Sequence, residues 1–94
     1  MSDVVTEAVA VLSEKISGGF DGSAKFVIED EGSIMIDSDG VRAGDDDADV
    51  TLTASADTFK GILTGEENPT AAFMTGKLKV DGDMGTAMKL SGVL

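Results

Sequence analysis

The chain has 94 residues, with 18 acidic against 7 basic side chains, a formal net charge of −11, and neither Cys nor His. This charge leaves no basic face that could neutralise nucleic-acid phosphates, and it disfavours docking on an anionic bilayer. The missing residue types exclude disulfides, thiolate nucleophiles, Cys-based metal sites and histidine as a catalytic base. The length predicts one domain, residues 1–94.

No apolar run approaches the roughly 18 residues that a membrane-spanning helix needs. The N-terminal residues lack the basic region of a secretory signal, and the C-terminal residues match no retention or peroxisomal address. We therefore expect a cytoplasmic protein without stable membrane insertion.

The first predicted element is a helix over residues 4–17, with Asp3 placed to cap its first turn. Its apolar residues recur at i, i+4, i+7 and i+11 and form one stripe: Val5, Val9, Leu12 and Ile16. The pair Gly18-Gly19 is expected to end this helix.

The pattern then changes to a period of two, which is typical of half-buried strands. Three strands are predicted, at residues 24–29, 34–36 and 41–43, and turn residues between them indicate an antiparallel meander. In the middle strand Ile34 and Ile36 share one face, and Met35 lies on the other.

The second half predicts a strand, two helices, a strand and a final helix, with large apolar residues at nearly every inward position of residues 68–90. The fourth and fifth strands contain alternating apolar residues: Val50, Leu52 and Ala54, then Leu78 and Val80. Residue types that begin or end helices mark the boundaries: Ser55 and Gly65, Asn68-Pro69 and Gly76, and Asp83.

The predicted order is therefore αβββ followed by βααβα. Helices and strands are mixed without strict alternation, which indicates an α+β domain. We expect a mixed five-stranded sheet with the helices packed on one face.

No motif for metal binding, phosphate binding or catalysis matches the sequence well. Residues 45–49 are rich in Asp, but a calcium loop starting at Asp45 would need Gly at the position of Val50 and Glu at the position of Ala56. The glycines do not match phosphate-binding spacings. No catalytic, cofactor-binding or metal-binding residues are predicted, and we expect no enzyme activity, although a pair of carboxylates remains the open catalytic alternative.

Several short pieces of residues 48–90 match one known family in order and spacing. The pieces are Ala48-Asp49-Val50-Thr51-Leu52-Thr53, Phe59 with Leu63-Thr64-Gly65, Asn68-Pro69 with Ala72-Phe73, Gly76-Lys77-Leu78-Lys79-Val80 with Gly82, and Met84-Gly85 with Ala87-Met88-Lys89-Leu90. This half of the chain resembles the sterol carrier protein 2 (non-specific lipid-transfer protein) domain, and the chain looks like a small stand-alone bacterial-type member.

The resemblance implies an apolar tunnel between sheet and helices that binds a fatty acid, a fatty acyl-CoA or another lipid without catalysis, with sterol the less favoured ligand. Adaptable methionines suit such a ligand. The candidate lipid-binding residues are large and apolar: Ile34, Ile36, Phe59, Ile62, Leu63, Phe73, Met74, Leu78, Met84 and Met88.

A competing interpretation has the same architecture but no bound ligand, and the chain is then a structural or protein-interaction module. The same apolar residues would then pack against one another, and the last helix would contact a partner. That partner would be a second copy of the chain or an enzyme of lipid metabolism, with the tunnel vestigial.

Overall fold

A computed structural model describes residues 3–16 and 19–93 of the chain. It contains nine elements in the predicted order. They are α1 (Asp3–Lys15), β1 (Ala24–Ile28), β2 (Gly32–Asp37), β3 (Gly40–Ala43), β4 (Val50–Ala54), α2 (Ala56–Thr64), α3 (Pro69–Met74), β5 (Leu78–Gly82) and α4 (Met84–Val93).

The five strands form one mixed sheet in the order β3-β2-β1-β4-β5. The predicted meander is confirmed, because β1–β2 and β2–β3 pair in antiparallel fashion. Among the described strands, one parallel pair joins β1 to β4 and aligns Phe26 with Leu52, and β5 then pairs antiparallel with β4. This pairing places β1 at the centre of the sheet, with β2 and β4 on either side.

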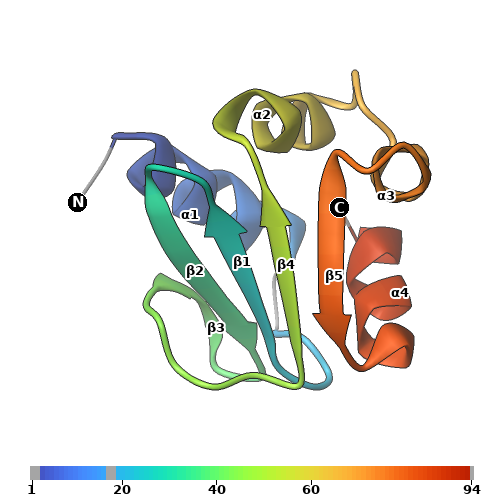
Figure 1. The fold of residues 1–94 in the computed structure, drawn as a ribbon. Helices are drawn as coiled ribbons and strands as arrows, with labels where there is room; N and C mark the ends of the chain where they lie inside the picture. Colours follow the sequence, from blue (N-terminus) through green and yellow to red (C-terminus); the bar gives the residue numbers. More distant parts are fainter. Residues whose placement is uncertain (1–2, 17–18, 94) are drawn as a thin grey trace.

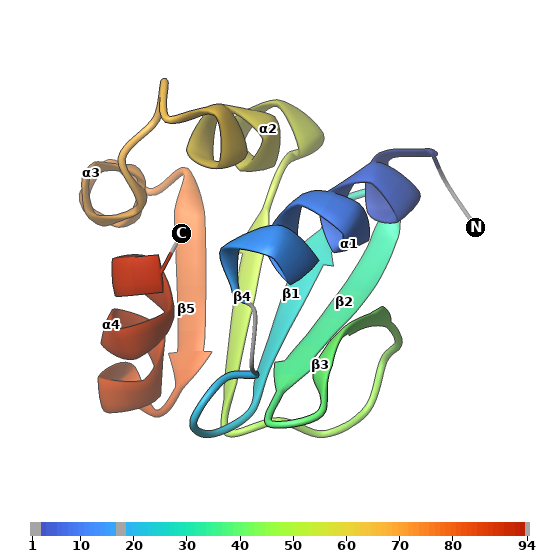
Figure 2. The same cartoon turned by 180° about the vertical axis from the view of Figure 1, so that it is seen from behind.

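The helices cover one face of the sheet, as predicted. Figure 1 shows α1 behind the sheet, α2 across its upper end and α3 beside the upper end of β5, and Figure 2 shows α1 and α4 on the side facing the viewer. The core lies between these layers, where Phe26 of β1 meets Phe59 of α2 edge-on, with ring centroids 4.5 Å apart. Both phenyl rings are fully buried, so α2 is tied to the middle of the sheet.

The first helix differs from the prediction at its start. Asp3 is the first helical residue, so its predicted role as a cap outside a helix that begins at Val4 is wrong. A carboxylate within the first turn still interacts favourably with the positive end of the helix dipole, which explains why the residue type suits either position. The helix ends at Lys15, two residues before the predicted end, and Ile16 lies in a turn. Of the residues predicted to end it, Gly19 has a positive φ of 91°, while Ser17 and Gly18 lie outside the described residues.

Met35 lies on the outer face of the sheet, as predicted, but it is only 2% exposed. The loop after β3 covers it: a Cβ at Gly44 would lie 3.0 Å from Met35 Cγ. An ion pair between Lys25 Nζ and Asp45 Oδ1, 2.8 Å apart, holds this loop against the sheet. Met35 is thus sheltered, and it is separated by the sheet from the face that carries the helices.

No helix within the described ranges combines the length and the apolar character that crossing a membrane requires.

Candidate functional site

A hollow of about 290 Å³ lies between α3, β5 and α4. We call it the α3–α4 groove. The described residues that line it include no ionisable side chain: Pro69, Thr70, Phe73, Met74, Leu78, Val80, Met84, Ala87, Met88 and Ser91. Such a lining can hold hydrocarbon, and it offers only the hydroxyls of Thr70 and Ser91 as polar side-chain groups.

Helix α3 forms one wall of this groove. Asn68 caps it, because its Oδ1 accepts hydrogen bonds from the N–H groups of Thr70 (2.8 Å) and Ala71 (3.3 Å). Ala72 is the residue that α3 buries, and it is fully covered. Since α3 approaches the sheet through this small side chain, the larger Phe73 and Met74 remain outside, 43% and 79% exposed.

Helix α4 forms the opposite wall by the same means. Ala87 and Leu90 pack toward the sheet and are at most 4% exposed. Met84 and Met88 are four residues apart, so they lie one above the other on the helix. They are 47% and 72% exposed and line the groove. Leu90 thus points inward as predicted, whereas the other large apolar residues of the two helices edge an open groove and do not point inward: Phe73, Met74, Met84 and Met88.

Asp83 fixes the start of α4. Its carboxylate accepts hydrogen bonds from the Thr86 hydroxyl (2.8 Å) and the Gly85 N–H (3.0 Å), which confirms the predicted cap. These bonds, the Thr86 one first, lower the pKa of the Asp83 carboxyl below its ordinary value of 3.8. The cap thereby fixes the first turn of α4, which begins with Met84, one of the residues that line the groove.

The lowered pKa of Asp83 predicts an acid-dependent loss of stability. A carboxylate whose pKa falls on folding stabilises the protein above its ordinary pKa of 3.8, and this contribution disappears as pH falls through the lowered value. Asp83→Asn should therefore lower the free energy of unfolding near neutral pH, with the difference from the parent chain shrinking in acid. Urea unfolding at about pH 7 and about pH 3 measures both differences.

The matched control for this prediction is Asp81→Asn, which removes an exposed carboxylate from β5. It should change stability less near neutral pH. If the difference in free energy of unfolding between Asp83→Asn and the parent chain increased in acid, the stabilising role assigned to this cap would be contradicted.

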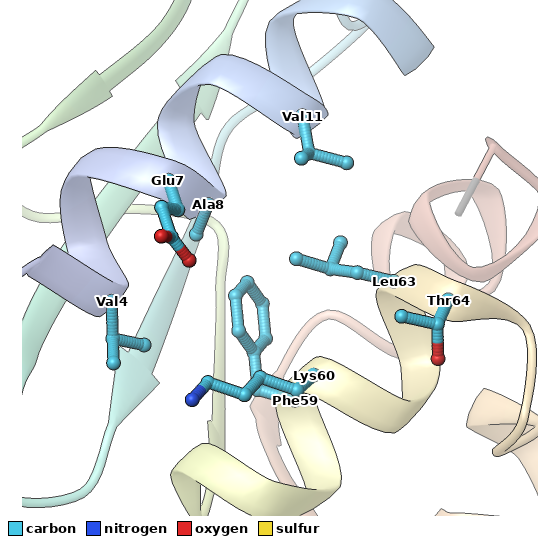
Figure 3. Close-up of a pocket in the computed structure, with 8 residues that line it drawn as sticks. All are labelled: Val4, Glu7, Ala8, Val11, Phe59, Lys60, Leu63 and Thr64. Atoms are coloured by element: carbon cyan, nitrogen blue, oxygen red, sulfur yellow. The ribbon is translucent and has the colours of Figure 1, made fainter.

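A second hollow, of about 280 Å³, lies between α1 and α2 (Figure 3). We call it the α1–α2 groove. Its lining residues are Val4, Glu7, Ala8, Val11, Phe59, Lys60, Leu63 and Thr64. In Figure 3, Val11 and Leu63 point toward each other across the gap between the helices. This lining differs from that of the α3–α4 groove because it includes a carboxylate and an ammonium group.

The ten predicted lipid-binding residues fall into three places. Five line the α3–α4 groove: Phe73, Met74, Leu78, Met84 and Met88. Two, Phe59 and Leu63, line the α1–α2 groove. The remaining three, Ile34, Ile36 and Ile62, are at most 2% exposed, belong to the packed core and line neither groove. A role for any of the ten in binding a ligand stays a prediction.

Helix α1 contributes to the α1–α2 groove, although none of its residues was predicted to line a site. Val4, Ala8 and Val11 recur at i, i+4 and i+7, which is a second apolar stripe beside the one that faces the sheet. This second stripe is the sequence feature from which the α1–α2 groove could have been predicted.

Residues 9–94 match a family model described as the SCP-2 sterol transfer family. Among curated proteins, Hydroxysteroid dehydrogenase-like protein 2 of Xenopus tropicalis is 40% identical over 81 residues, which cover 78% of this chain and 19% of that protein. Sterol carrier protein 2 of Homo sapiens is 41% identical over 63 residues, which cover 67% of this chain and 10% of that protein. The chain thus spans at most about a fifth of these relatives.

Solved structures show the same fold. The sterol carrier protein domain 2 of Helicoverpa armigera has a TM-score of 0.74 at 28% identity, covering 96% of this chain and 84% of that one. Sterol Carrier Protein-2 from Aedes aegypti, in complex with the C16 fatty acid palmitate, has a TM-score of 0.77 at 23% identity. That match covers 98% of this chain and 94% of that one, and at this identity it bears on the fold alone.

Proposed function

The chain belongs to the SCP-2 sterol transfer family, and we propose that it binds a fatty acid, a fatty acyl-CoA or a similar lipid in the α3–α4 groove without transforming it. The observation that carries this proposal is a groove whose described lining residues include no ionisable group, edged by exposed Phe and Met side chains. Exposed apolar patches of this kind mark binding sites more often than accidents of packing. Sterol remains the less favoured ligand.

Burial of hydrocarbon supplies the free energy that such binding needs. Each methylene removed from water contributes about 0.8 kcal/mol, so ten methylenes contribute about 8 kcal/mol before ordering costs. A groove of about 290 Å³ lies near the lower end of small-molecule sites, which run from about 300 to about 1,000 Å³. It would therefore hold part of a long acyl chain, and chain length would decide selectivity.

The charges favour the α3–α4 groove over the α1–α2 groove. Glu7 and Lys60 line the latter, and an acyl chain laid beside them would remove water from charged groups at a cost. The α3–α4 groove carries no such penalty, and Met74, Met84 and Met88 provide flexible thioether side chains that adapt to ligands of different shape.

Titration of the purified protein with an environment-sensitive fatty acid analogue tests the proposal. We expect saturable binding of one analogue per chain, displaced by unlabelled fatty acids, with affinity rising and then levelling between about eight and about eighteen carbons as the groove fills. A signal that never saturates, or that no unlabelled fatty acid displaces, would contradict it.

The same exposed side chains support a second candidate function, a contact surface for another chain. The relatives named above contain this region as a fifth or less of a longer protein, which is consistent with an accessory domain beside a lipid-metabolism enzyme. Native mass spectrometry of freshly purified protein separates the candidates. Monomers that carry a lipid mass support lipid binding, and dimers free of lipid support a protein contact between copies.

A further inference from the structure

Three methionines lie at the α3–α4 groove, and all three are open to solvent. Met74 is 79% exposed, Met88 72% and Met84 47%. We propose that this methionine rim is an oxidation site at which a peroxide, organic or inorganic, releases the bound apolar ligand. The proposal rests on the lipid-binding function proposed above and adds its regulation.

The chemistry is a two-electron oxygen transfer. The thioether sulfur attacks one peroxide oxygen, the O–O bond breaks and an S–O bond forms. Sulfur is oxidised by two electrons and the peroxide is reduced by two, leaving as water or as an alcohol after proton transfer. The step needs no further reactant, and the product, methionine sulfoxide, is reducible by methionine sulfoxide reductases.

Exposure makes the reaction selective for the rim. The chain has no Cys, so methionine is its only sulfur-containing residue type. Met35 provides an internal reference, because the loop at Gly44 covers it and leaves it 2% exposed. A peroxide in solution reaches the sulfur atoms of the rim directly, whereas it reaches Met35 only when that loop opens.

Methionine sulfoxide at the rim would weaken binding of the apolar ligand while leaving the fold intact. Oxidation turns an apolar side chain into a strongly polar one. Among the described residues, the groove offers only the hydroxyls of Thr70 and Ser91 as side-chain partners, so a ligand would desolvate the new S–O group without full compensation. Because α4 contacts the sheet through Ala87 and Leu90, a change at Met84 or Met88 lies away from the core.

The first experiment measures where oxygen is added. The protein is treated with hydrogen peroxide, and its tryptic peptides are followed over time by mass spectrometry. Met35 falls in peptide 26–42 and Met74 in peptide 61–77, and fragmentation separates Met84 from Met88 within peptide 80–89. We expect the rim to oxidise at least about tenfold faster than Met35, and a bound fatty acid to slow the rim selectively. Equal rates for Met35 and the rim would overturn the selectivity.

The second experiment measures affinity for the fatty acid analogue before and after peroxide. We expect a loss of about tenfold or more, recovered after treatment with methionine sulfoxide reductases. The comparison variants are Met35→Leu and the triple variant Met74→Leu/Met84→Leu/Met88→Leu. Each is judged by its own ratio of affinities, so a change in starting affinity does not matter. Met35→Leu should still lose affinity, and the triple variant should not.

The outcomes distinguish the proposed release by oxidation from the lipid-binding function on which it rests. If the rim oxidises and the affinity ratio stays near one, the release mechanism is overturned while lipid binding stands. If the untreated protein binds no fatty acid, the proposed function fails and release fails with it, even where the rim oxidises selectively. If far-ultraviolet circular dichroism shows that oxidation unfolds the chain, the loss of affinity is global and the local mechanism is overturned.

Discussion

Met88→Asp is expected to weaken fatty acid binding by about thirtyfold or more, because a carboxylate beside hydrocarbon must lose water that the hydroxyls of Thr70 and Ser91 do not fully replace. Met88 lines the α3–α4 groove and is 72% exposed, so its replacement opens no cavity in the core. The variant should therefore fold like the parent chain. Titration with the fluorescent fatty acid analogue measures the affinity, and thermal unfolding verifies the fold.

The matched control is Val11→Asp, which places the same charge in the α1–α2 groove. Val11 also lies on a helix surface and is 37% exposed, so the two substitutions differ chiefly in which groove they alter. We expect Val11→Asp to leave the affinity within about threefold of the parent value. The reverse pattern, with Val11→Asp weakening binding and Met88→Asp without effect, would move the ligand to the α1–α2 groove.

Local patterns were enough to predict the elements and their order. A period of two marks β1, β2 and β4, and Ser55, Asn68 and Asp83 mark helix starts because their side chains accept the free N–H groups there. The same patterns gave the meander of β1, β2 and β3, but they could not place β4 and β5 in the sheet. Pairing β1 with β4 brings together segments about 26 residues apart, and only packing of the whole sheet selects that partner.

The candidate site was predicted in part, and the reason lies in side-chain size. Apolar periodicity identifies residues that avoid water, but it does not separate core from groove. Helix α3 approaches the sheet through Ala72, and α4 through Ala87 and Leu90, which leaves the neighbouring Phe and Met side chains outside. The opposite holds for Ile34 and Ile36, which were predicted as ligand contacts and are fully buried in the core. Which residue a helix turns inward depends on the surface it meets, and that surface is formed by distant strands.

Gly82→Ala is expected to be the most destabilising single change among the glycines of the sheet. Gly82 ends β5 with φ of +118°, and a Cβ there would clash with the Asp49 carbonyl oxygen and lie 2.9 Å from Val50 Cα. Both atoms belong to the backbone, so relief requires moving β4 away from β5 and disturbing the hydrogen bond from the Asp83 N–H to the Asp49 carbonyl. This edge of the sheet supports the floor of the α3–α4 groove and the start of α4.

Gly40→Ala separates the clash from the backbone strain, because Gly40 also has φ of +118° but a Cβ there would meet nothing within 4 Å. Strain alone should cost about 1–3 kcal/mol at either position. The clash should add about 2 kcal/mol or more at Gly82, which corresponds to a melting temperature lower by about 8 °C or more than that of Gly40→Ala. Equal melting temperatures for Gly82→Ala and Gly40→Ala would show that β4 and β5 can move apart at little cost in free energy. The edge of the sheet beneath the α3–α4 groove would then be easily deformed.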